Sequence, residues 1–314
     1  MKFSNGKYRD ATSGKLRVTS SKESFPHKGR AGYLARKKLA EEKALGAPIK
    51  KDTGWGRVAE WYHETVEDRA SYQRDLIMPN LMRLMDIKPG QKILDLGCGE
   101  GLFTRRFAKA GAEVTAIDIS KELVEIAKRE AVSEGGQYQF QPRFFISDAA
   151  AIPMVGSGSQ DAVVITLALQ NMERATDVLR ECSRVLKSGG QLFITLNHPA
   201  FRGIKSSDWS WSEKGDLQYR RVWRYMSESR ERIDMTPSAS SGRGPGVQGV
   251  GEQTVSFNRP LQFYVKHIGK AGMAVVNMEE WVSEKKSLPG PRSDAGNTAR
   301  KEFPLFMMIE VVKM

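Results

Sequence analysis

The chain has 314 residues, of which 40% are hydrophobic, and a formal net charge of +12. This length allows one large α/β domain with extensions, or two modest domains. No run of about eighteen uncharged apolar residues occurs, so we expect no membrane span.

Cysteines and histidines are few. Cys98 and Cys182 are the only cysteines, which argues against a disulfide framework and favours a reducing compartment such as the cytoplasm. The sequence has no CxxC pair, and its four histidines are scattered along the chain. We therefore expect no metal site.

The positive charge is concentrated in residues 1–51. This segment holds fourteen Lys and Arg against four Asp and Glu, a net charge of +10, and few large apolar side chains. Such a composition predicts a basic, mostly disordered tail that is either inert or weakly RNA-binding. An acid-poor end that contains Arg and Ser is also typical of a transit peptide, which would send the protein to an organelle. The start of the chain lacks the apolar stretch of a secretory signal.

Helices and strands alternate over most of the remaining chain. From Trp55 to residue 86 the apolar residues recur at helical spacing, and Pro79 starts or kinks the second of one or two helices. Strand-like runs follow at 92–96, 112–117, 141–147, 161–168 and 190–197, with helical segments at 101–110, 120–133 and 173–187. This alternation indicates a parallel, doubly wound sheet that is covered on both faces. The glycines of "KSGG", 187–190, are expected to end the last of these helices.

The pattern changes after the fifth strand. Residues 200–257 are rich in Trp, Arg, Ser and Gly, and we interpret them as an inserted lid, because so long a loop is usually functional or disordered. A helix at 260–272, a strand at 274–282, another loop and the apolar end "FPLFMMIEVV" follow. The last two strands are expected to pair like a hairpin and to complete a mostly parallel seven-stranded sheet, so that residues 52–314 form one domain.

The stretch "KILDLGCGEG" joins the first strand to a helix through three glycines, Gly97, Gly99 and Gly101. Glycines at this place let the chain turn sharply and let a ligand approach the backbone amides. The dinucleotide fingerprint needs its third glycine one residue later, where the sequence has Leu102. Glu100 in the turn would also repel a pyrophosphate. A cofactor without phosphates, such as S-adenosylmethionine, therefore suits the loop better than NAD does.

Two acids follow the next two strands. Asp118 comes twenty-one residues after Gly97, where a carboxylate can accept both ribose hydroxyls of S-adenosylmethionine or of NAD. Asp148 follows the third strand, where it can accept from the amine of adenine while Ala149 leaves room for the ring. Either acid could instead be a helix N-cap. Together with the glycines, these features at three consecutive strand ends indicate an adenosine site.

These motifs resemble those of class I S-adenosylmethionine-dependent methyltransferases of the methyltransferase type 11 kind. The resemblance rests on "ILDLGCGEG", "AIDIS", "SDAAAIP" and "DAVVITLALQNM", and covers residues 55–200 closely and 255–314 loosely. It implies a Rossmann-like methyltransferase fold, S-adenosylmethionine as cofactor and methyl transfer as activity. It also implies a set of cofactor-binding residues within these motifs: Asp95, Gly97, Cys98, Gly99, Asp118, Ile119, Asp148, Ala149, Leu167 and Gln170.

A helix before the first strand often closes the cofactor pocket in this family. The segment "AEWYHE" occupies that place, so Tyr62 becomes a further cofactor-binding candidate, with His63 beside it. The same spacing also fits a partly buried amphipathic face that touches no ligand.

The acceptor side of the site is expected near "TLNHPAFR", at the end of the fifth strand. Methyl transfer depends mainly on in-line positioning, and needs a general base only for a hydroxyl or a carbon acid. His198 is the candidate base, Asn197 a second catalytic candidate, and Arg202 a candidate for binding an acidic substrate group. Alternatively, His198 is a loop histidine bonded to the backbone and Arg202 is an exposed cation.

The insert supplies further substrate candidates. Read as a strand, "YRRVWRY" puts Tyr219, Arg221, Trp223 and Tyr225 on one face. These side chains could stack on nucleic-acid bases, line a small-substrate pocket, or simply pack as a lid with solvated arginines. Arg259 and Tyr264, in "NRPLQFYVKH", would extend the same wall.

Four functions remain open. A small-molecule oxygen or carbon methyltransferase is favoured, because the domain is nearly neutral and has no "NPPY" or "DPPY" motif of the kind that cradles a planar nitrogen. An RNA methyltransferase that uses the basic tail is the second possibility. A non-catalytic protein that binds S-adenosylmethionine is the third, and a dehydrogenase the fourth.

Overall fold

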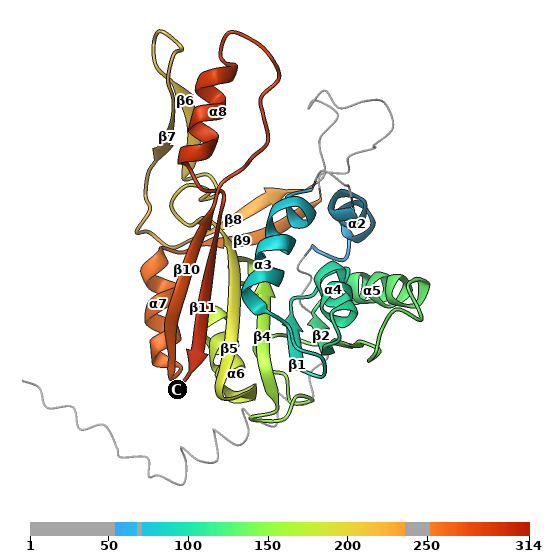
Figure 1. Ribbon diagram of the computed structural model, residues 1–314. Helices are drawn as coiled ribbons and strands as arrows, with labels where there is room; N and C mark the ends of the chain where they lie inside the picture. The colour runs from blue at the N-terminus through green and yellow to red at the C-terminus, as the bar shows by residue number, and fades with distance from the viewer. Residues whose placement is uncertain (1–53, 68–70, 236–251) are drawn as a thin grey trace, which may run out of the picture. The chain divides into compact units, whose positions relative to one another are not determined.

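Seven strands form one sheet in the order β10-β11-β5-β4-β1-β2-β3 (Figure 1). The computed structural model describes residues 54–67, 71–235 and 252–314. The basic tail predicted over residues 1–51 lies outside these ranges.

The first five strands along the chain run parallel in the sheet, as the alternating pattern predicts. They are β1 (Lys92–Leu96), β2 (Glu113–Asp118), β3 (Arg143–Ile146), β4 (Gln160–Thr166) and β5 (Leu186–Asn197). β10 (Met273–Trp281) and β11 (Phe306–Lys313) pair antiparallel to each other, and β11 is also antiparallel to β5. The predicted fold class is confirmed. Because the parallel strands share one direction, their carboxyl ends meet at one edge of the sheet.

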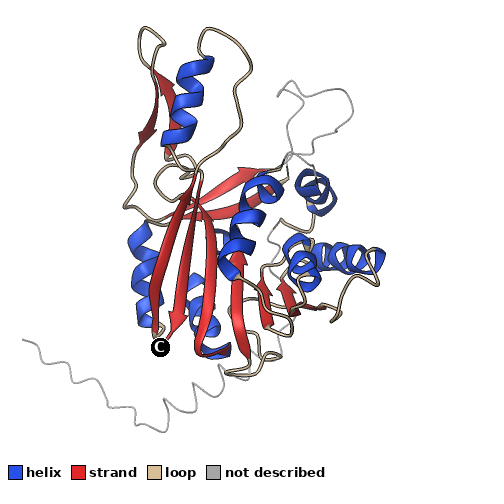
Figure 2. Ribbon diagram, in the orientation of Figure 1, coloured by secondary structure: helices blue, strands red, loops and turns tan. Residues whose placement is uncertain are grey.

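Helices cover both faces of the sheet (Figure 2). On one face, α3 (Met78–Met85) and α4 (Leu102–Lys109) pack with the strand residues Ile93, Val114, Val164 and Phe193. Pro79 lies at the start of α3, after the short π-helix η1 (Gln73–Ile77). On the other face, α6 (Ala175–Val185) and α7 (Leu261–Lys270) pack with Leu94, Val163, Ile165 and Leu192. Successive residues of a strand thus pack into the two hydrophobic cores on opposite faces of the sheet.

Two further helices lie beside the first strands. α5 (Lys121–Ser133) follows β2, and the Ser120 hydroxyl caps its start by accepting a hydrogen bond from the amide of Leu123 at 3.2 Å. α2 (Ala59–Glu67) lies at the beginning of the described chain and contacts α5. The residues that follow β1 and β2 are therefore held between helices at the carboxyl edge of the sheet.

The "KSGG" segment does not end a helix, so that prediction is wrong. α6 already ends at Val185, and residues 187–190 belong to β5, where the pairing with β4 shifts register between Gln160 and Ala162. Gly189 has φ = +74°, a left-handed backbone that glycine adopts without strain. A glycine at a strand irregularity and one at a helix end look alike in a sequence.

The insert at 200–257 contains two hairpins. β6 (Ser207–Trp211) pairs with β7 (Gln218–Val222), and β8 (Ser229–Asp234) pairs with β9 (Gln253–Asn258). The continuous strand predicted for "YRRVWRY" is wrong: β7 ends at Val222, and Arg224 has φ = +55°, which turns the chain. α8 (Ser293–Glu302), in a segment predicted to be a loop, contacts β7, and the Arg292 guanidinium lies 5.1 Å from the Trp211 ring.

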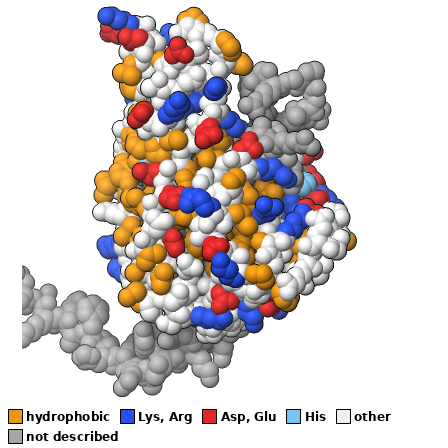
Figure 3. Space-filling model, in the orientation of Figure 1, with side chains coloured by type: hydrophobic (Ala, Val, Ile, Leu, Met, Phe, Trp, Pro, Cys, Tyr) orange, Lys and Arg blue, Asp and Glu red, His pale blue; other side chains and the backbone are white. Residues whose placement is uncertain are grey.

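On the surface in Figure 3, Lys and Arg lie interspersed with Asp and Glu. No helix among the described residues is long and apolar enough to cross a bilayer. The same residues contain no cluster of three or more His, Cys, Asp or Glu that could hold a metal ion. Cys98 and Cys182 are both buried free thiols.

Candidate functional site

A cavity of about 230 Å³ opens at the carboxyl edge of the sheet, where β1, β2, β3 and β4 end. Its wall includes eight of the eleven residues predicted to bind a cofactor: Tyr62, Gly97, Gly99, Asp118, Ile119, Asp148, Ala149 and Leu167. Asp95, Cys98 and Gln170 are buried beside the cavity but do not line it.

The loop after β1 requires its glycines. Gly97, Gly99 and Gly101 have φ values of +81°, +56° and +85°, in the left-handed region that other residues rarely adopt. A Cβ on Gly97 would lie 2.5 Å from the Cβ of Ala168, and one on Gly101 would lie 2.9 Å from the Cβ of Ala127. The bare loop therefore fits against the neighbouring segments and turns its backbone toward the cavity.

Asp118, at the end of β2, joins this loop to the cavity. Its Oδ2 accepts a hydrogen bond from the amide of Gly99 at 2.9 Å, and its Oδ1 accepts one from the amide of Ser120, also at 2.9 Å. Burial raises the pKa of this carboxyl above its ordinary value, against the effect of the amide donors. Each oxygen keeps a lone pair, so further donors from a ligand would stabilise the ionised form.

Asp95, in β1, lies just before the glycine loop. Its carboxyl is buried and accepts a hydrogen bond from the Thr104 hydroxyl at 2.5 Å on α4. Burial, with a smaller contribution from the charges of Asp118 and Glu100, raises the pKa of Asp95 to about 7, against the lowering effect of the Thr104 hydrogen bond. Burial likewise raises the pKa of the Cys98 thiol well above its ordinary value, so Cys98 is a packed neutral group. Both residues lie behind the cavity wall.

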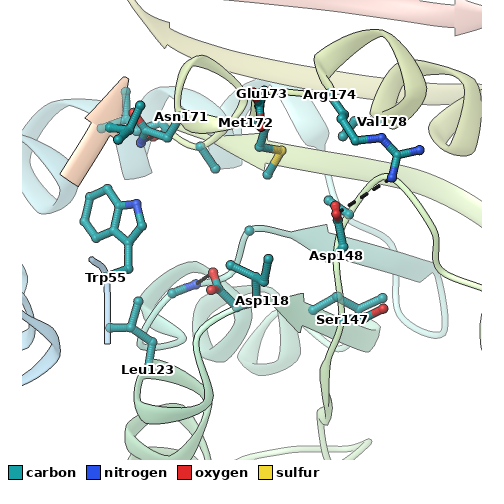
Figure 4. Close-up of a pocket in the computed structure, with 18 of the residues that line it drawn as sticks. Trp55, Asp118, Leu123, Ser147, Asp148, Asn171, Met172, Glu173, Arg174 and Val178 are labelled. Atoms are coloured by element: carbon teal, nitrogen blue, oxygen red, sulfur yellow. Dashed lines mark hydrogen bonds and ion pairs between the residues drawn. The ribbon is translucent and has the colours of Figure 1, made fainter. Parts of the chain in front are cut away.

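Asp148 lies on the cavity wall after β3. Its Oδ1 accepts a hydrogen bond from the amide of Ala150 at 2.9 Å, and its Oδ2 lies 4.0 Å from Nη1 of Arg174 (Figure 4). In Figure 4, Asp148 and Arg174 occupy one end of the cavity, and Trp55 and Asn171 lie at the other. The carboxylate remains partly exposed toward the cavity, where it can accept a further hydrogen bond.

The end of β4 forms a strained wall. Leu167 has φ = +53°, unusual for a residue with a branched side chain, and its carbonyl accepts hydrogen bonds from Gln170 Nε2 (2.9 Å) and Asn171 Nδ2 (3.2 Å). The Gln170 side chain thus points back to the backbone, away from the cavity. Thr166 lines the cavity with a buried hydroxyl that has no hydrogen-bond partner among the described residues.

Glu100, predicted to repel a pyrophosphate, does not line the cavity. The side chain is buried with Arg105, whose Nη1 lies 3.4 Å from Oε2, and it accepts a hydrogen bond from the amide of Leu102. His63 of α2 lies 3.7 Å from the same Oε2 and 3.6 Å from Glu130 of α5. Glu100 therefore connects the glycine loop to α2, α4 and α5.

The start of the described chain covers the glycine loop. The rings of Trp55 and Tyr62 meet edge to face at 5.3 Å, and both line the cavity. A Cβ on Gly54 would lie 2.0 Å from the carbonyl oxygen of Gln253, and Arg57 pairs with Glu252 at 2.5 Å. The segment before α2 and the start of β9 are therefore in contact beside the cavity.

The residues predicted to act on the acceptor lie outside the cavity wall. Nε2 of His198 is 2.6 Å from Oε1 of Glu280, and Nδ1 accepts hydrogen bonds from the amides of Ala200 and Phe201. Burial lowers the pKa of His198, and Glu280 partly offsets this effect. The geometry is thus that of the alternative, a loop histidine bonded to the backbone. Asn197 likewise does not line the cavity.

The predicted substrate residues are mostly engaged elsewhere. The Arg202 guanidinium lies 4.8 Å from the Phe306 ring, and Trp223 is exposed away from the cavity. Tyr225 accepts a hydrogen bond from the amide of Leu261, and Tyr264 is buried in the core, where burial raises its pKa to about 12.

Arg259 is part of the support of the cavity. It is buried and donates to the carbonyl groups of Leu169 (3.4 Å), Met172 (2.9 Å) and Glu173 (3.1 Å), while its guanidinium lies 4.7 Å from the Phe257 ring. It therefore holds the segment after β4 against β9, without lining the cavity itself.

Sequence reasoning missed the wall opposite the glycine loop. This wall includes Asn171, Met172, Glu173 and Arg174 from the segment after β4, and Arg230, Val255 and Phe257 from the β8–β9 hairpin. The alternation in "TVSF" was a signal for β9. No local signal indicates that this hairpin reaches the cavity.

Residues 94–194 match the sequence model of a family described as "Methyltransferase domain". A ubiquinone biosynthesis O-methyltransferase of Xanthomonas axonopodis pv. citri is 39% identical over 109 residues, which are 34% of this chain. The matched region spans 44% of that relative's length.

Solved structures share the fold. An S-adenosylmethionine-dependent methyltransferase from Mesorhizobium loti has a TM-score of 0.57 at 21% identity, covering 78% of this chain and 99% of that chain. One from Clostridium acetobutylicum has a TM-score of 0.55 at 15% identity, covering 82% and 98%. The predicted resemblance is confirmed for the domain and for its fold.

Proposed function

We propose that this chain, whose residues 94–194 form a methyltransferase domain of the class I type, transfers a methyl group from S-adenosylmethionine to an oxygen or carbon atom of a small molecule. One observation carries the proposal. The glycine loop after β1, Asp118 after β2 and Asp148 after β3 line the same cavity.

The wall of the cavity fits S-adenosylmethionine. Asp118 offers free lone pairs to the two ribose hydroxyls, and Asp148 offers one to the adenine amine, beside Ala149. The unpartnered hydroxyl of Thr166 and the glycine loop line the part of the wall nearest β1 and β4, where the amino-acid end would lie. When bound, this cofactor supplies an electrophilic methyl group on a sulfonium.

The acceptor would enter beside Met172, Val255 and Phe257, the apolar side chains of the opposite wall. These side chains suit the apolar part of a small organic acceptor, and the Xanthomonas relative is an O-methyltransferase by name. Since His198 has no free ring nitrogen, we do not assign it as the base. The chain would then act mainly by holding the acceptor in line with the methyl group.

A thermal-shift panel tests the donor site. S-adenosylmethionine and its demethylated product S-adenosylhomocysteine should raise the Tm, because a ligand at a hundredfold excess over its Kd adds about 2.7 kcal/mol to the free energy of unfolding. NAD should leave the Tm unchanged. Asp118→Asn should weaken S-adenosylhomocysteine binding about tenfold or more, through the loss of charged hydrogen bonds. Glu113→Gln, at the other end of β2, is the control.

A labelling experiment tests the acceptor. Methyl-labelled S-adenosylmethionine is incubated with the protein and either a small-metabolite extract or total RNA. Label should appear in the small-molecule fraction. Label in RNA alone would overturn the acceptor class, and absence of any shift with either sulfur ligand would overturn the donor.

A further inference from the structure

The β8–β9 hairpin brings two arginines to the acceptor side. In its antiparallel register, Arg230 lies opposite Phe257 and Arg232 opposite Val255. Opposite residues and residues two apart share one face, so these four side chains lie on the same face of the hairpin. Arg230, Val255 and Phe257 line the cavity, which identifies this face as the one turned toward it.

The two arginines on this face have no partner. Neither side chain forms a hydrogen bond or ion pair with any residue in the described part of the chain. Asp234, the acid on the same face, instead accepts a hydrogen bond from Gln253 at 2.8 Å. Arg174, the other arginine of the cavity wall, pairs with Asp177 at 2.9 Å. Arg230 is thus a free cation beside apolar groups.

The β8–β9 hairpin contacts the segments on both sides of the cavity. The Ser256 hydroxyl donates to the carbonyl of Gln170 at 3.3 Å, and Gly54, next to Trp55, touches the backbone of Gln253. The start of β9 therefore lies near Trp55 and Gln170, whereas Asp148 and Arg174 lie at the opposite end of the cavity from Trp55 (Figure 4). We assign a ligand group beside Arg230 to the acceptor, because Arg230 comes from the hairpin and not from the strand ends that would hold the adenosine.

We propose that the methyl acceptor carries an anionic group, a carboxylate or a phosphate, that Arg230 binds while Val255 and Phe257 hold its apolar part. A guanidinium matches both anions through paired N–H donors. Arg232, two residues further along the same face, adds a second positive charge near Arg230. This inference rests on the proposed function, because it assigns the acceptor end of the same cavity.

Matched ligand pairs test the inference on the full chain saturated with S-adenosylhomocysteine. The probes are 4-hydroxyphenylacetate, its neutral methyl ester and hydroquinone monophosphate, with calorimetry as the readout. The carboxylate or the phosphate should bind about tenfold more tightly than the ester, as a charge-assisted hydrogen bond provides. The stronger of the two identifies the anion.

Variants locate the effect. Arg230→Met should remove the preference for the anion, and Arg230→Lys should restore part of it. Arg106→Met, which removes an exposed arginine of α4 outside the cavity, should leave the preference unchanged. S-adenosylhomocysteine binding is measured in every sample, so loss of that binding reports failure of the donor site instead.

The inference is overturned if neither anion binds the wild-type protein more tightly than the ester, including the case in which no probe binds. It is also overturned if Arg230→Met keeps the preference while S-adenosylhomocysteine binding is intact.

Discussion

Asp118 accepts a hydrogen bond from the amide of Gly99 at 2.9 Å, which ties the acid at the end of β2 to the loop that follows β1. The same carboxylate faces the cavity, and its other oxygen accepts from Ser120 at the start of α5. The group proposed to hold the ribose therefore also fixes the shape of the loop, so binding and loop conformation depend on one side chain.

Gly97→Ala should strongly destabilise the protein and abolish cofactor binding. Its φ of +81° costs an alanine about 1–2 kcal/mol, and the new Cβ would lie 2.5 Å from that of Ala168, which adds about 1–3 kcal/mol of overpacking. Gly90→Ala is the matched control, because Gly90 has φ = +78° but open space around it. Equal losses of unfolding free energy in urea for the two variants would contradict the packing argument.

Asp95 should make the protein less stable as the pH rises. Its pKa is about 7 in the folded protein, above that of the unfolded chain, so unfolding releases its proton between about pH 4 and pH 7. Asp95→Asn keeps an acceptor for Thr104 and should gain stability over wild type progressively across this range. Urea unfolding at several pH values measures the difference, and Asp86→Asn, at an exposed acid, serves as control. A difference that does not change with pH would refute the role of burial.

His63 should stabilise the protein at acidic pH. The Glu100 carboxylate, 3.7 Å from Nδ1, raises the pKa of His63, and burial opposes this effect; Glu130 adds a smaller increase and Arg105 a smaller decrease. Its contribution is therefore complete below the unfolded pKa near 6.5 and is lost as the pH rises through the folded pKa. His63→Gln should cost about 0.5–1 kcal/mol at pH 5.5 and nearly nothing at pH 9. A loss of the same size at both values would show that packing, not charge, is responsible.

Arg259 should contribute to the stability of the protein through its hydrogen bonds to the cavity wall. Arg259→Met leaves the carbonyl groups of Leu169, Met172 and Glu173 without their donor, and should cost about 2–3 kcal/mol of unfolding free energy. Arg221→Met breaks an exposed pair with Asp208, which solvent screens, and should change the stability far less. Thermal unfolding of the two variants gives the comparison, and similar Tm values would exclude the role of Arg259.

The sheet and its binding edge were predictable because they depend on local patterns. Alternating strands and helices specify a doubly wound sheet, and acids that directly follow consecutive parallel strands must meet at one edge, as Asp118 and Asp148 do. The approach of the β8–β9 hairpin was not predictable, because it depends on contacts such as that of Ser256 with Gln170, far away in the sequence.

Residue type alone does not predict which groups can bind the acceptor. His198 and Arg259 have the chemistry of a base and an anion-binding group, but the fold uses their polar atoms for internal hydrogen bonds. A sequence does not reveal whether a polar side chain is already satisfied. Arg230, which is not, lies in a strand whose position only the tertiary structure supplies.

The contact between Gly54 and Gln253 brings the start of the domain and the inserted β8–β9 hairpin together beside one cavity. The residues that match the family end at 194, before either hairpin begins. If the proposed function holds, exchange of the hairpin would change the range of acceptors and leave the binding of the methyl donor unchanged. Grafting residues 229–258 between homologous proteins of this fold should move selectivity without moving donor affinity.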